Sequence, residues 1–160
     1  WPWPEPRLSY GNAVLAEAMI AAGVALEAPK LWRRGLELLA WLLAVETAGD
    51  QLSPTPAGGW GPGDPRPGFD QQPIEVAALA DACARAAAVD PSPAWPDGVR
   101  AAAAWFQGAN DAGQLMWDPQ TGGGFDGLHA DGVNRNQGAE STLAVIATLQ
   151  HARRISLLQQ

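Results

Sequence analysis

Two segments of the sequence begin with glutamine, carry a glutamate three residues later and continue into an apolar run. The first spans Gln72 to Glu75, and the second spans Gln137 to Glu140. Carboxylates in the first turn of a helix interact favourably with its N-terminus, and acids and amides form directed hydrogen bonds to hydroxyl groups. Each segment follows a long loop rich in glycine and polar residues. The repeat therefore predicts that several helix ends build one shared polar site.

The same loops supply further acids and amides. Paired carboxylates can act as acid and base in glycosidic cleavage, and amides orient sugar hydroxyls. The candidate catalytic acids are Asp70, Glu75, Asp126 and Glu140. The candidate substrate-binding amides are Gln71, Gln72, Asn134, Asn136 and Gln137. Trp60 lies in a loop rich in proline and glycine, where its indole offers a platform for the apolar face of a sugar ring.

A purely structural role competes with this interpretation. A glutamate in the first helical turn stabilises its own helix by about 0.5–1 kcal/mol through capping and dipole effects. A single such residue therefore needs no further function. Two of them, each following a long loop that bears an aromatic residue, favour a ligand site.

Composition excludes several other functions. The net charge is −7, from 10 basic and 17 acidic residues, which argues against binding to nucleic acid or to an anionic membrane surface. No apolar run is long enough to span a bilayer. The run from Asp126 to Asp131 lacks the ligand spacing of a calcium or zinc site and is expected to be a solvated loop. We therefore expect neither a metal nor a cofactor.

Two further features bear on cellular location. The single cysteine, Cys83, excludes an internal disulfide and is expected to be a small buried hydrophobe. The start of the sequence, Trp1 to Glu5, lacks the basic region and apolar core of a signal peptide. This predicts a cytoplasmic protein, although a mature secreted chain would begin in the same way.

Helical periodicity dominates the chain, and no stretch alternates in the manner of a strand. The expected helices cover residues 12–23, 29–49, 73–89, 96–107 and 139–155, where the first could also start at Tyr10 and the fifth at Gly138. Asn12 is expected to cap the first helix and Gly23 to end it. Glu46 is expected on the exposed face of the second helix. The pattern predicts an all-α fold of antiparallel helical hairpins, in which the odd-numbered helices all begin at the end that carries the long loops.

Several ordered segments resemble a known group of proteins. They are Trp3, Leu8 to Ala13, Gly59-Trp60, Phe69 to Glu75, Asp126-Gly127 and Asn134 to Thr142. The most specific parts are Asp-Gln-Gln-Pro-Ile-Glu and Asn-Gln-Gly-Ala-Glu-Ser-Thr. Together they resemble the all-helical region of bacterial proteins labelled as glycosyltransferases or as uncharacterised, a region similar to the (α/α) toroids of six-hairpin glycosidases. The resemblance covers nearly the whole chain and implies a role with carbohydrate.

A complete six-hairpin toroid has far more helices than the five expected here. We therefore expect residues 1–160 to form a single helical domain that is a fragment or half of a larger toroid, or that a second copy completes. The leading hypothesis is a carbohydrate-binding or carbohydrate-processing domain, and any enzymatic activity would be of the glycosidase or glycosyltransferase type. One alternative is a non-catalytic accessory or oligomerisation module of a glycosyltransferase. Another is a helical scaffold that binds protein.

Overall fold

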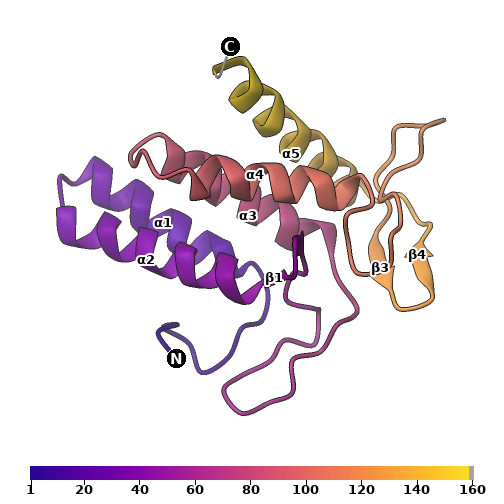
Figure 1. Ribbon diagram of the computed structural model, residues 1–160, viewed down its shortest axis with the longest axis horizontal. Helices are drawn as coiled ribbons and strands as arrows, with labels where there is room; N and C mark the ends of the chain where they lie inside the picture. The colour runs from indigo at the N-terminus through magenta and orange to yellow at the C-terminus, as the bar shows by residue number, and fades with distance from the viewer. Residues whose placement is uncertain (159–160) are drawn as a thin grey trace.

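Helices dominate the fold. The computed structural model describes residues 1–158, and this part of the chain contains five α-helices (Figure 1). They are α1 (Asn12–Ala25), α2 (Pro29–Val45), α3 (Pro73–Ala87), α4 (Ala94–Phe106) and α5 (Ala139–Leu158). All five lie where the hydrophobic pattern predicts them, so the expectation of a mainly helical chain is confirmed. The largest difference is at the end of α2, which stops at Val45 instead of near Gly49.

The helix starts follow simple rules with one exception. Pro29 and Pro73 are the first residues of α2 and α3, positions where the missing N–H of proline costs nothing. The expectation that Asn12 caps α1 is wrong. Gly11 occupies the cap with φ 63°, a left-handed backbone that suits glycine, and the helix begins at Asn12. The Asn12 side chain instead accepts a hydrogen bond from the backbone N–H of Ser9 at 2.9 Å.

The centre of the bundle is α3, which contacts all four other helices. Most of its residues are buried, and half of these are alanines, whose small side chains let neighbouring helices approach closely. Cys83 is fully buried on this helix, and burial raises the pKa of its thiol to about 12. The prediction of a small buried hydrophobe at this position is confirmed.

Two glycines allow α1 and α2 to pack against each other. A Cβ atom at Gly23 would lie 2.4 Å from the backbone nitrogen of Trp32. A Cβ atom at Gly35 would lie 2.8 Å from Cγ1 of Ile20 and 2.9 Å from the carbonyl oxygen of Ala16. The expectation that Gly23 ends α1 is therefore wrong. This glycine lies inside the helix because the partner backbone leaves no room for a side chain.

We expect Gly35→Ala to lower the free energy of unfolding by about 1–3 kcal/mol, since the added methyl group overpacks this contact. The better helix propensity of alanine offsets only part of the cost. Gly58→Ala is the matched control, because no atom lies within 4 Å of its would-be Cβ. Urea unfolding of both variants measures the effect, and equal stabilities would contradict the close-packing argument.

The expectation of an all-α fold is wrong in detail, because two small antiparallel hairpins occur in the long loops. They are β1 (Thr47–Ala48) with β2 (Gln51–Leu52), and β3 (Gly127–His129) with β4 (Gly132–Asn134). Each has a two-residue turn, and the first turn contains Gly49 with φ 62°. Gly-Asp is a favoured sequence for such turns, but strands this short leave no alternating pattern for sequence analysis to detect.

The long loops are ordered by pairing with distant segments. Residue Leu8 pairs with Trp60, and Gln71 pairs with Leu128 through two backbone hydrogen bonds of 2.9 Å each. The second pairing attaches β3 to the segment that leads into α3, so both lie at the same end of the bundle as the start of α5 (Figure 1). Within residues 1–158, no helix is both long enough and apolar enough to cross a membrane.

Candidate binding site at the helix N-termini

The starts of α1, α3 and α5 meet, as the sequence predicts. The carboxylate of Glu75 in α3 accepts hydrogen bonds from the backbone N–H of Gly11 at 2.5 Å and of Asn12 at 3.4 Å. The hydroxyl of Tyr10 donates to Oε2 of Glu140 in α5 at 3.4 Å. Three consecutive residues before and within α1 therefore contact the first turns of both other helices. Glu75 and Glu140 consequently face the same end of the bundle.

The two glutamates differ in accessibility. Glu75 is only 5% exposed, and its oxygens are occupied by the N–H groups at the start of α1. Burial raises its pKa, although the hydrogen bonds from Gly11 and Asn12 act in the opposite direction. Glu140 is exposed, and its oxygen beside Tyr10 remains open to solvent. Of the two, Glu140 is therefore the one that a ligand can reach.

Tyr10 was not singled out from the sequence as a site residue. Its side chain is 62% exposed although it bonds to Glu140. Partial burial, followed by the negative charges of Glu140 and Glu75, raises the pKa of the phenol. The hydroxyl therefore keeps its proton at neutral pH and remains a hydrogen-bond donor.

Asp126 organises the start of α5. Its Oδ1 accepts hydrogen bonds from the backbone N–H of Gly138 at 2.8 Å and from Oγ of Ser141 at 2.7 Å, and its Oδ2 accepts one from the side chain of Asn136. The bond from Ser141 is the main cause that lowers the pKa of Asp126, with the other two bonds adding to it. Asp126 is therefore held as an anion and fixes the geometry of the loop around Glu140.

Asp70 forms a pair that the sequence did not reveal. Its Oδ1 lies 3.1 Å from Nδ1 of His129, and both side chains are substantially exposed. His129 belongs to β3, so the expectation of a solvated loop between Asp126 and Asp131 is wrong. The strand pairing of Gln71 with Leu128 brings the histidine beside the acid. Ala130-Asp131, the turn of this hairpin, is not a favoured turn sequence, so little in the sequence indicates it.

Gln71 is fully buried, and its amide is fully engaged within the protein. Its Oε1 accepts a hydrogen bond from Nε1 of Trp105 at 3.0 Å. Its Nε2 donates to the carbonyl oxygen of Gly68 at 2.8 Å and to Oδ2 of Asp111. The same carboxylate of Asp111 also accepts a bond from Oγ of Ser53 at 2.5 Å. We call these five residues the Gln71 network. It ties the loop before α3 to α4 and to the loop that follows α4.

The other candidate amides lie nearer the surface. Gln72 is half-buried at the cap position of α3. Asn134, Asn136 and Gln137 are exposed around the start of α5. Gln137 accepts a bond from the Thr121 hydroxyl at 2.7 Å and donates one to a neighbouring carboxylate. Asn134, Asn136 and Gln137 lie between Asp126 and Glu140 in the chain, and a ligand that bonds to them would replace hydrogen bonds on the protein surface.

Trp60 belongs to a different cluster. Its ring lies edge-on to Trp1, with ring centroids 5.4 Å apart, and Trp1 in turn contacts Trp41 of α2. The side chain is half-buried, and its buried indole N–H has no hydrogen-bond partner among residues 1–158. The structure thus groups Trp60 with the N-terminal segment and α2.

A second buried acid lies close to Glu75. Glu46 follows the last turn of α2, is 2% exposed and accepts a hydrogen bond from the backbone N–H of Thr55 at 3.0 Å. Its expected place on the exposed face of α2 is therefore wrong. Burial raises its pKa to about 7, and the negative charge of Glu75 acts in the same direction. Its spacing of four residues from the buried Leu42 was the signal for this position.

The candidate site thus contains exposed acids, a histidine and amides on a buried hydrogen-bonded frame. Among the described residues, no group of three or more His, Cys, Asp or Glu side chains could hold a metal ion. No protein-family model matches the chain, and no curated protein matches it at a significant level.

Proposed function

We propose that the end of the bundle where α1, α3 and α5 begin binds a carbohydrate. The observation that carries this proposal is the meeting of the three helix starts through the contacts of Gly11 with Glu75 and of Tyr10 with Glu140. Around this point lie a phenol that donates, a carboxylate that accepts and several amides that can do either. Directed donors and acceptors of this kind match the hydroxyl groups of a sugar.

Binding is better supported than cleavage. Glu75 and Asp126 are occupied as hydrogen-bond acceptors at the starts of α1 and α5, so neither is free to transfer a proton. Glu140 and Asp70 remain accessible. If the domain processes glycosides, we propose that these two acids take part, with His129 beside Asp70. A non-catalytic accessory module of a glycosyltransferase is favoured by the same engagement of Glu75 and Asp126.

We also infer that the bundle is part of an (α/α) toroid. In support, α3 packs between α1 and α5, while α2 pairs with α1 and α4 with α3. Such an arrangement gives an inner row of three helices and an outer row of two. The site would then lie at the N-terminal ends of the inner row, and further helices from the same protein or a second copy would extend the ring.

The test is a calorimetric titration with tetrasaccharides of glucose, mannose and xylose. We expect Glu140→Gln to weaken binding about tenfold or more, since hydrogen bonds to charged groups contribute about 1.5–3 kcal/mol. Tyr10→Phe removes a neutral donor and is expected to cost about three- to tenfold. Glu37→Gln, an exposed acid on α2, is the charge-matched control.

Two results would contradict the proposal. One is the absence of binding to every tetrasaccharide, and the other is unchanged affinity in both site variants. Analysis of the same mixtures for shortened or extended glycans separates a processing domain from a binding module.

A further inference from the structure

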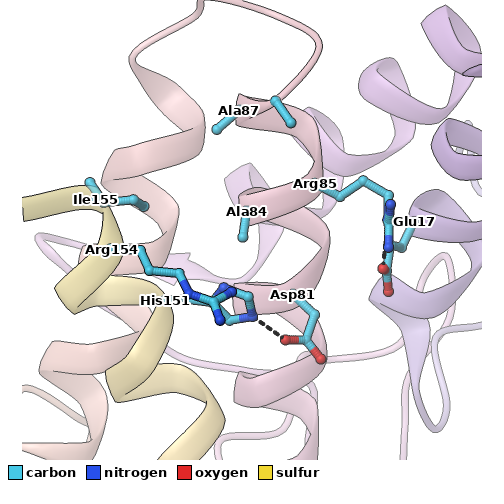
Figure 2. Close-up of a pocket in the computed structure, with 9 residues that line it drawn as sticks. Glu17, Asp81, Ala84, Arg85, Ala87, His151, Arg154 and Ile155 are labelled. Atoms are coloured by element: carbon cyan, nitrogen blue, oxygen red, sulfur yellow. Dashed lines mark hydrogen bonds and ion pairs between the residues drawn. The ribbon is translucent and has the colours of Figure 1, made fainter. Parts of the chain in front are cut away.

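A second cavity lies away from the helix starts, between α1, α3 and α5. It has a volume of about 560 Å³ and lies along the C-terminal halves of α3 and α5. Figure 2 shows His151 and Arg154 reaching into it from α5, with Arg85 and Glu17 on the opposite side. We call this cavity the α3–α5 groove. None of the candidate residues at the helix starts lines it.

Both acids of the groove have a basic partner that also lines it. Glu17 of α1 pairs with Nε of Arg85 at 2.8 Å, and Asp81 pairs with Nε2 of His151 at 2.7 Å. Because an ionised carboxylate only accepts hydrogen bonds, Nε2 of His151 carries the hydrogen in this contact. The two pairs connect α3 to its neighbours on either side, and Arg85 balances the charge of Glu17.

One positive charge in the groove remains uncompensated. Arg154 is exposed and has no ion pair or hydrogen bond with any residue that the structure describes. Nδ1 of His151 likewise has no hydrogen-bond partner within residues 1–158. A guanidinium presents several donors in a plane that fits a carboxylate or phosphate. Arg154 therefore offers an anion-binding group, and Nδ1 of His151 in the same groove can accept a hydrogen bond from a protonated oxygen of a phosphate or carboxyl group.

The rest of the groove is apolar. Its floor consists of Ala84, Ala87 and Ala88 from α3, with Ile155 from α5 along one wall. These small side chains leave space that a flat or linear hydrocarbon can fill, and burial of that apolar surface favours binding. We propose that the α3–α5 groove binds a small amphipathic anion, a carboxylate or phosphate carried on an apolar body.

The net charge of −7 means that an anion would bind to this protein only where local groups attract it. An acidic protein repels anions over most of its surface, so the attraction must come from local groups. Octyl phosphate is a suitable probe because it combines a phosphate with a linear apolar chain. The chain has two histidines, and His129 in β3 lies outside the groove. In an NMR titration we expect the ring resonances of His151 to shift and those of His129 to stay unchanged.

Neighbouring arginines provide a matched pair of variants. Arg154 lines the groove, whereas Arg153 is also exposed but does not line it. We expect Arg154→Gln to weaken octyl phosphate binding about tenfold and Arg153→Gln to leave it unchanged. Ala87→Leu fills the floor from an exposed position and is expected to weaken binding without unfolding the helix. Amide spectra of each variant establish that the fold is retained.

Simpler ligands separate the two halves of the proposal. Inorganic phosphate tests the charge alone, and octanol tests the apolar chain alone; both are expected to bind at least tenfold more weakly than octyl phosphate. Equal affinity for octanol would overturn the anion requirement, and equal affinity for inorganic phosphate would overturn the apolar part. An unchanged affinity in Arg154→Gln, or no shift at His151, would overturn the site itself. None of these outcomes depends on carbohydrate binding at the helix starts.

Discussion

Gln71→Ala is expected to lower the free energy of unfolding by about 3–5 kcal/mol. The substitution leaves the buried Nε1 of Trp105 without an acceptor and removes a donor from the carboxylate of Asp111. A buried polar group without a partner costs about 1–3 kcal/mol, and the cavity left by the side chain adds to this. The loss is a large fraction of the stability of an ordinary domain, about 5–15 kcal/mol. Urea unfolding and the melting temperature both report it.

The neighbouring residue supplies the control for this prediction. Gln72 has the same side chain, is half-buried and makes no side-chain cap at the start of α3. We expect Gln72→Ala to change the free energy of unfolding by about 0.5 kcal/mol or less. If the two alanine variants were equally stable, the Gln71 network would not be a principal support of the loops.

Glu46→Gln is expected to make stability less dependent on pH. In the folded protein the pKa of Glu46 is about 7, against an ordinary value of 4.5. Between these values the folded state binds more protons than the unfolded state, so the free energy of unfolding of the native protein falls as pH rises. The difference corresponds to about 3 kcal/mol. Glutamine keeps the acceptor for Thr55 and does not titrate.

The measurement is urea unfolding of both proteins between pH 4.5 and pH 8. At each pH the free energy of unfolding of the native protein is subtracted from that of Glu46→Gln. We expect this difference to increase by about 3 kcal/mol between pH 4.5 and pH 8. The raised pKa of Glu75 gives a slope of the same sign in both proteins, so it largely cancels in the comparison. Glu37→Gln, at an exposed position on α2, should show no such gain. If the free energies of unfolding of the native protein and of Glu46→Gln changed with pH in parallel, the burial of an uncharged Glu46 would be contradicted.

Sequence periodicity located the helices because the apolar residues of each one recur at helical spacing over several turns. It also predicted that the starts of α1, α3 and α5 converge, since alternating long and short links fix their directions. It failed where tertiary contact decides the role of a residue. Gly23 has the sequence signature of a helix stop, but its position is explained only by the backbone of Trp32 in the next helix.

The residue types of the candidate site could be predicted from the sequence, but the role of each residue was harder to predict. The acids and amides follow from the two repeated segments, but sequence cannot tell a free carboxylate from one that caps another helix. Glu75 is an example, because its partners lie more than sixty positions earlier in the chain. His129 escaped notice for a similar reason. Its position beside Asp70 depends on strand pairing between two loops.

The start of α1 has no side-chain cap from its own segment and depends on the carboxylate of Glu75 in α3. Without the second hairpin the start of α1 would lose this acceptor, and without the first hairpin the carboxylate of Glu75 would lose its donors. The two hairpins thus form one cooperative unit, in which local opening of either one weakens the other. Dividing the chain between α2 and α3 would cut through that unit, even though the long loop between them has the composition of a linker.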